Sequence, residues 1–99
     1  MLADMATRIH TSRVLVQHTA WLVDQGRCNR KIAGMAKLFA SEALGFVADH
    51  AVQIFGGMGY MRELPIERMY REARFYRIVE GTSEIQRMII AKDLMQEMD

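Results

Sequence analysis

The sequence predicts an all-α fold, an up-and-down bundle of three longer helices and one short helix. Apolar residues recur at helical spacing along the chain. The first 25 residues contain neither glycine nor proline, and the single proline and a run of glycines stand where helices are expected to begin or end. We find no internal repeat and no linker, so residues 1–99 are interpreted as one helical domain.

The first helix is expected to run from about Leu2 to Gln25 and to end at Gly26, a typical C′ glycine. Its apolar stripe contains Leu2, Met5, Ala6, Ile9, Val16, Ala20 and Val23. Further apolar residues on other sides are Val14, Leu15, Trp21 and Leu22. A helix that is apolar on more than one side needs cover on more than one side. Because the other helices supply too little cover, either the chain self-associates or a helix of a longer parent protein is missing.

The second helix is expected to begin at Asn29, a favoured N-cap residue, and to end near Phe55. Its apolar stripe contains Ile32, Met35, Ala36, Phe39, Ala43, Phe46, Val47 and Ile54. Polar residues on its other sides are Lys31, Lys37, Ser41, Glu42 and Asp49. The glycines expected to stop this helix are Gly56, Gly57 and Gly59. Pro65 suits the first turn of a short helix that ends near Arg74, and residues 75–81 are expected to be extended or irregular.

The last helix is expected to begin at Thr82 or Ser83 and to run to about Gln96. Ser83 and Gln86 have the spacing of a capping box, in which two side chains satisfy free backbone N–H groups at a helix start. The residues expected to face inward are Ile85, Met88, Ile89 and Met95. This helix completes the predicted bundle.

The composition argues against several classes of function. Lys and Arg number 13 and Asp and Glu 12, so the formal charge of +1 gives no general attraction to nucleic acid or to an anionic membrane. The single cysteine, Cys28, cannot form an internal disulfide, and no Cys or His residues have the spacing of a metal site. No apolar run approaches the roughly 20 residues of a membrane-spanning helix.

Two stretches of sequence together resemble the closing part of acyl-CoA dehydrogenases. The first, at 51–60, reads A-V-Q-I-F-G-G-M-G-Y. The second combines Y-R-E-A-R at 70–74 with I-V-E-G-T-S-E-I-Q-R at 78–87. The segment W-L-V-D-Q-G-R at 21–27 is also similar to the first interhelix corner of that family. The resemblance implies an incomplete C-terminal four-helix bundle that lacks its opening helix, which explains the uncovered side of the first helix.

The resemblance implies an FAD-dependent oxidation of an acyl-CoA to its trans-2-enoyl-CoA. A carboxylate removes the α-proton of the thioester while the β-hydride passes to the flavin. The family's base corresponds to Glu80, and we assign Gly81 to substrate contact because glycine lets the backbone approach a ligand closely. The alternative reading of Glu80 is an acid that stabilises the following helix through its dipole, worth about 0.3–1 kcal/mol.

The resemblance also implies two regions of flavin contact. One contains Gln53, Ile54, Phe55, Gly56 and Gly57, which correspond to residues that touch the FAD held by a neighbouring subunit. The other contains Thr82, Ser83 and Glu84, although many members of the family have glutamine where this chain has Glu84. The alternative for the first region is a glycine stop between two helices.

A cluster of arginines lies between the two motifs, at positions Arg62, Arg68, Arg71, Arg74 and Arg77. These side chains could steer the phosphates of coenzyme A or FAD. Glutamates are interleaved with them, and Glu67 and Arg71 have i,i+4 spacing. A solvated helix with salt bridges is therefore the favoured interpretation.

The family resemblance finally implies partners and a setting. The intact enzyme is expected to be a homotetramer that passes electrons to an electron-transfer flavoprotein, in the cytoplasm of a bacterium or the mitochondrial matrix of a eukaryote. The 99 residues alone are expected to be inactive, because most of the flavin and acyl-CoA pocket lies outside them. The alternatives are an acyl-CoA oxidase or related flavoenzyme of the same fold, and a helical interaction module without catalytic activity.

Overall fold

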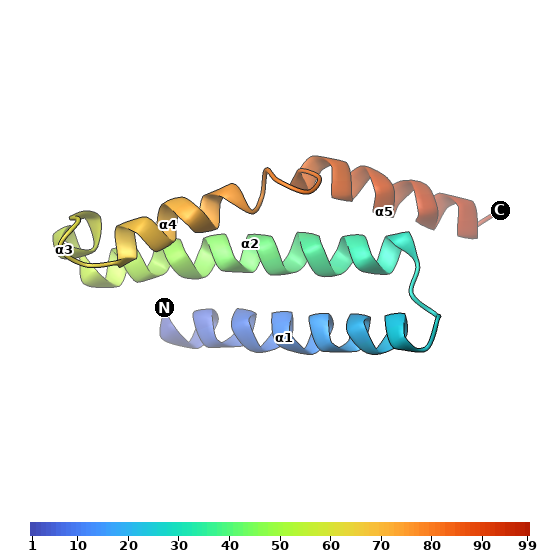
Figure 1. The fold of residues 1–99 in the computed structure, drawn as a ribbon, viewed down its shortest axis with the longest axis horizontal. Coiled ribbons are helices and arrows are strands. Elements are labelled where there is room, and N and C mark those ends of the chain that lie inside the picture. Colours follow the sequence, from blue (N-terminus) through green and yellow to red (C-terminus); the bar gives the residue numbers. More distant parts are fainter.

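The computed structural model describes residues Met1–Asp99, and its regular elements are all helices, joined by short irregular segments (Figure 1). Its elements are α1 (Leu2–Asp24), α2 (Arg30–Phe55), α3 (Gly57–Tyr60), α4 (Ile66–Phe75) and α5 (Ser83–Glu97). The predicted all-α class and the four predicted helices are confirmed, and the single-turn helix α3 is an addition. Residues 76–82 are irregular, as expected. None of the helices has the length and apolar character of a membrane span.

Helix α2 lies in the middle of the molecule, between α1 and the pair formed by α4 and α5 (Figure 1). Helix α1 runs antiparallel along one side of α2, while α4 and α5 follow one another along another side (Figure 1). Helix α1 packs only on α2 and makes no helix contact with α4 or α5. The molecule is therefore elongated, with extents of 52 × 22 × 21 Å.

Small residues on α2 let the neighbouring helices approach closely. The buried residues of this helix are Gly34, Ala36, Ser41, Ala43 and Ala48. A Cβ atom at Gly34 would lie 3.1 Å from the side-chain oxygen of Gln86 on α5. A Cβ atom at Gly45 would lie 3.3 Å from Nε of Arg77, just after α4. The packing of α2 therefore depends on small side chains as much as on its large apolar ones.

The side of α1 that packs on α2 is not the predicted apolar stripe. Thr19 and Leu22 are buried, whereas Leu2 and Val23 of the predicted stripe are 71% and 58% exposed. A polar residue can face α2 here because the Thr19 hydroxyl donates to the Leu15 carbonyl within the same helix, at 2.7 Å. The apolar periodicity identified the side of α1 that has no partner within this chain. The expectation that α1 is apolar on more than one side is nevertheless confirmed.

The inward face of α5 was also predicted wrongly. Met88 and Met95 are 66% and 67% exposed, and Ile85 is exposed as well. Only Ile89 of the predicted set is half-buried. The side that faces α2 carries polar residues such as Asp93, whose carboxylate accepts from Arg30 Nε at 3.2 Å. This ion pair lies beside an apolar contact that was not predicted, in which the half-buried Ile90 packs against Gly34 of α2.

The helix ends follow their expected chemistry with one change. The Asn29 side chain accepts from the backbone N–H of Ile32 at 2.9 Å, which confirms this N-cap. At the start of α5 the N-cap is Thr82, whose hydroxyl oxygen accepts from the backbone N–H of Ile85 at 3.1 Å. The predicted capping box between Ser83 and Gln86 is therefore wrong, because the side chains of both residues bond elsewhere.

Glycine is required at two positions after α2, for a different structural reason at each. Gly56 ends the helix with φ of +62°, a left-handed conformation that L side chains rarely adopt. Gly59 lies in α3, where a Cβ atom would stand 2.9 Å from the Val52 carbonyl oxygen. The glycines thus stop α2 as predicted and also let α3 fold back on the end of α2.

Candidate functional site

The turn that precedes α5 holds Glu80 in an unusual backbone conformation. Glu80 has φ of +55° and Gly81 has φ of +85°, so two consecutive residues lie in the left-handed region. For a residue other than glycine this conformation costs about 1–3 kcal/mol and persists only where the surroundings hold it. Glu80 is the only residue other than glycine with positive φ in the chain. The contacts that hold this turn therefore matter to the site.

Helix α2 and the first turn of α5 hold the backbone on both sides of Glu80. The Lys37 ammonium donates to the Tyr76 carbonyl at 2.8 Å and to the Gly81 carbonyl at 2.7 Å. The Gln86 side chain donates to the carbonyl of Glu80 itself at 3.3 Å.

A second group of contacts fixes the start of α5. The Ser83 backbone N–H donates to the Arg77 carbonyl at 3.0 Å, and the Ser83 hydroxyl donates to the Glu42 carboxylate at 2.8 Å. Glu42 also pairs with Arg77 at 3.5 Å and with Arg87 at 3.8 Å. A single carboxylate on α2 therefore ties α5 to the start of the irregular segment.

The Glu80 side chain itself is exposed and has no partner. No hydrogen bond or ion pair within the chain uses its carboxylate, and only its backbone carbonyl is bonded. Thr82 caps α5 with its side chain, so Glu80 is not needed for that purpose. The turn thus presents a free carboxylate at a fixed backbone position.

The three residues predicted to contact flavin next to Glu80 have different surroundings. Thr82 uses its hydroxyl oxygen as an acceptor, which leaves the hydroxyl hydrogen free to donate. Ser83 is buried, and both of its donors are bonded within the chain. Glu84 is exposed, with Arg87 at 3.9 Å. A hollow of about 110 Å³ is lined by Glu42, Arg74, Arg77, Ile78, Thr82, Ser83 and Glu84.

The second predicted flavin region lies at the other end of α4, where α2 ends. The residues Gln53, Ile54, Phe55, Gly56 and Gly57 are all exposed. No atom lies within 4 Å of a Cβ atom built at Gly56 or Gly57, so a ligand can approach the backbone there. At about 1.5 Å per residue, Gln53 lies roughly 16 Å along α2 from Glu42, which bonds to Ser83. The structure therefore does not bring the two regions together within one chain.

Comparison with known proteins assigns the domain. Residues 1–95 match the family model described as acyl-CoA dehydrogenase, C-terminal domain. The chain belongs to this family. It is 46% identical over 97 residues to cyclohexane-1-carbonyl-CoA dehydrogenase of Geobacter metallireducens, a match that covers 98% of this chain and 26% of that protein. It is 50% identical over 95 residues to the mitochondrial short-chain specific acyl-CoA dehydrogenase of Bos taurus, covering 96% of this chain and 23% of the relative.

The fold of a solved relative agrees with this assignment. The structure of butyryl-CoA dehydrogenase from Megasphaera elsdenii superimposes with a TM-score of 0.91 at 40% sequence identity. The match covers 95% of this chain and 24% of that chain. The chain thus spans about a quarter of the length of the relatives it matches.

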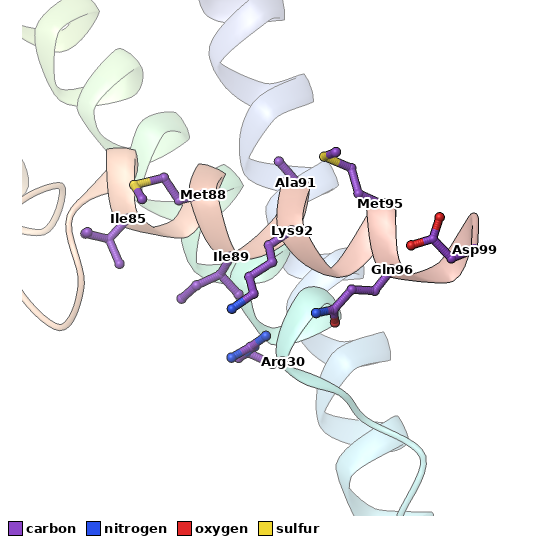
Figure 2. Close-up of a pocket in the computed structure, with 9 residues that line it drawn as sticks. All are labelled: Arg30, Ile85, Met88, Ile89, Ala91, Lys92, Met95, Gln96 and Asp99. Carbon is purple, nitrogen blue, oxygen red and sulfur yellow. The ribbon is translucent and has the colours of Figure 1, made fainter.

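One depression on this acyl-CoA dehydrogenase domain is separate from the predicted site. It is open, has a volume of about 710 Å³ and follows the side of α5 that carries Met88 and Met95 (Figure 2). Arg30, from the start of α2, lies at its edge (Figure 2). None of the residues predicted to contact flavin or substrate lines it.

Three of the five arginines between the two motifs form ion pairs, namely Arg68, Arg71 and Arg77, whereas Arg62 and Arg74 form none. Arg71 bonds to Glu67 at 2.9 Å and Arg68 pairs with Glu72 at 3.8 Å, which confirms the expected salt-bridged helix. The bond from Arg71 lowers the pKa of the Glu67 carboxyl below its usual range. No group of His, Cys, Asp and Glu side chains is arranged to hold a metal ion.

Sequence reasoning missed the residues that hold the Glu80 turn. Lys37 and Glu42 were placed among the polar residues of α2 and given no role, and Gln86 was assigned to a capping box. Lys37 and Glu42 face the irregular segment from one side of a helix whose other sides pack on α1 and α5. Polar side chains on a helix that is covered on several sides were the signal that could have identified them.

Proposed function

We propose that the chain is the C-terminal part of an FAD-dependent acyl-CoA dehydrogenase, in which Glu80 removes the α-proton of an acyl-CoA thioester to give the trans-2-enoyl-CoA. The observation that supports this proposal most directly is the free carboxylate of Glu80 on a turn held from two sides. Its place in a family of acyl-CoA dehydrogenases supplies the substrate class.

The chain's own residues have distinct tasks in this proposal. The Glu80 carboxylate takes the α-proton, and the adjacent backbone of Gly81 lies against the substrate. FAD, held in part by Thr82, would supply the hydride acceptor that the β-carbon requires. Glu80 is exposed in this chain, so the rest of the parent protein must close the pocket and exclude water from the carboxylate.

The residues present fit a flavin cofactor at two separate places. The free hydroxyl hydrogen of Thr82 is a suitable donor, and the exposed Glu84 lies two residues further along. We assign Ser83 to holding Thr82 in place, because its own donors are occupied. The open backbone at Gly56 and Gly57 suits the phosphates of FAD.

The family resemblance suggests how the two places are used in the parent protein. They lie roughly 16 Å apart along α2. Following that resemblance, we propose that they contact different FAD molecules. The segment from Gln53 to Gly57 then belongs to the FAD of a neighbouring subunit, as in a homotetramer. The 99 residues alone lack most of the pocket and are proposed to be inactive.

The electron acceptor is proposed to be an electron-transfer flavoprotein, in a bacterial cytoplasm or a mitochondrial matrix. An oxidase of the same fold is the rival, and the reactivity of the reduced flavin with oxygen distinguishes the two. The relatives compared above are dehydrogenases by name, which favours the first reading.

The proposal is tested with the intact parent enzyme and its Glu80→Gln variant. Each is mixed anaerobically with a panel of saturated acyl-CoAs, and bleaching of the flavin absorbance is followed. We expect the variant to bind ligand but to bleach about 100- to 10,000-fold more slowly than the wild type. Equal bleaching would remove Glu80 from the reaction, and no bleaching with any acyl-CoA would contradict the proposed substrate class.

A further inference from the structure

We propose that Lys37 is a positioning residue for Glu80, and that its ammonium group holds the two ends of the turn that presents the carboxylate. This inference rests on the proposed function, because it assigns Lys37 a part in the reaction for which Glu80 is the base. Lys37 touches neither the carboxylate nor any reacting atom, so its effect would pass through the backbone.

The Lys37 ammonium bonds to two carbonyl groups, one four residues before Glu80 and one on the residue directly after it. Its Nζ donates to the Tyr76 carbonyl at 2.8 Å and to the Gly81 carbonyl at 2.7 Å. An ammonium group carries three donors and no acceptor, and its bonds are stronger than those between neutral groups. One side chain of the longest helix therefore fixes the chain both before and after Glu80.

No carboxylate competes for the Lys37 ammonium. None of the ion pairs in the structure includes Lys37. Lys31, on the same helix, instead pairs with Glu97 of α5 at 2.6 Å. Lys37 is half-buried, and its charge is directed at two backbone carbonyls. Lys37 therefore binds backbone carbonyls of the segment around Glu80, whereas Lys31 joins two helices through an ion pair.

The Glu80 turn needs such a restraint. Glu80 and Gly81 both have positive φ, and an L residue such as Glu80 prefers other conformations when it is free. The other bonds that restrain this segment are neutral: the Ser83 backbone N–H donates to the Arg77 carbonyl at 3.0 Å, and Gln86 donates to the Glu80 carbonyl at 3.3 Å. Without Lys37 the turn would visit other conformations. A displacement of a reacting group by about 1 Å can cost roughly 100-fold in rate.

The test uses the intact parent enzyme with FAD bound and the variants Lys37→Arg, Lys37→Gln and Lys37→Met. Each is mixed anaerobically with the acyl-CoA that bleaches the wild type fastest, and FAD content and acyl-CoA affinity are measured separately. We expect Lys37→Met to bleach about 100-fold more slowly, Lys37→Arg to retain most of the rate, and Lys37→Gln to lie between them. FAD content and acyl-CoA affinity should stay at wild-type values. If Lys37→Met does not fold, the test uses the bleaching rates of the other two variants, and Lys37→Arg should be faster than Lys37→Gln.

The matched control is Lys31→Met, which removes an ammonium group from the same helix and breaks its contact with α5. This variant should bleach at the wild-type rate. A wild-type rate in all three Lys37 variants, or a loss that only follows lost FAD or weaker acyl-CoA binding, would overturn the role of Lys37. Glu80→Gln is measured in parallel: if it bleaches normally the proposed base fails, whereas a slow Glu80→Gln beside unaffected Lys37 variants overturns only this inference.

Discussion

The properties of single residues in this domain depend on backbone conformation as well as on side-chain chemistry. From its type and position alone, Glu80 is an acid just before a helix, for which dipole stabilisation is a sufficient explanation. The family motif suggested catalysis, and the structure adds the positive φ and the unpaired carboxylate. The positive φ cannot be read from the residue type, because the turn is held by contacts with Lys37 of α2 and Gln86 of α5.

The ion pair between Arg30 and Asp93 should make stability depend on pH. The hydrogen bond from Arg30 lowers the pKa of Asp93. A carboxyl whose pKa is lower in the folded state stabilises the fold above its unfolded pKa, about 3.9, and loses this contribution as pH falls through the folded pKa. Asp93→Asn should therefore lower the melting temperature at neutral pH, and the difference from wild type should shrink below about pH 4.

Thermal unfolding followed by circular dichroism between pH 2 and pH 7 measures this difference. The control is Asp99→Asn, because Asp99 is exposed and forms no ion pair. A difference between wild type and Asp93→Asn that stays constant over the whole pH range would contradict the assigned role of the ion pair.

At the scale of helices, the sequence predicts positions well and faces poorly. All four predicted helices begin and end within two residues of their observed bounds, because caps and breakers are local signals. The faces of α1 and α5 were wrong because both helices pack on α2 through mixed residues such as Thr19 and Asp93. Apolar periodicity locates an apolar side, but it does not say which molecule or segment covers that side.

The N-cap of α2 offers a local test of this account. Asn29→Ala removes the acceptor for the Ile32 backbone N–H and should lower the free energy of unfolding by about 1 kcal/mol. Asn29→Asp keeps an acceptor at the same place and should stay close to wild type. Urea denaturation of the two variants and the wild type gives the values. A wild-type free energy of unfolding in Asn29→Ala would show that the cap contributes nothing, and an equal loss in both variants would show that the lost acceptor is not the cause.

At the scale of the whole molecule, the chain leaves apolar sides of two helices without cover. Its middle helix is covered by α1 and by α4 with α5, while one apolar side of α1 and one of α5 are exposed. The sequence predicted the surplus on α1 from its composition. The sequence does not predict the corresponding surplus on α5, because the periodicity of Ile85, Met88 and Met95 is the same whether this side is covered or exposed.

Exposed apolar sides of this kind should make the isolated chain self-associate. Val16→Glu places a charge in the exposed stripe of α1 and should reduce association, whereas Gln17→Glu adds the same charge at the neighbouring exposed position and should not. Light scattering over a range of concentrations measures the effect. A wild-type chain that stays monomeric at high concentration would contradict this prediction.

The central claim, that Glu80 removes the α-proton, is tested most directly by separating that step from hydride transfer. The intact enzyme is incubated anaerobically in deuterated water with an acyl-CoA whose β-carbon carries no hydrogen, so that no hydride can leave. Mass spectrometry then follows deuterium entering the α-position. The account predicts uptake with the wild type and uptake at least about 100-fold slower with Glu80→Gln. Equal uptake by the two proteins would contradict it.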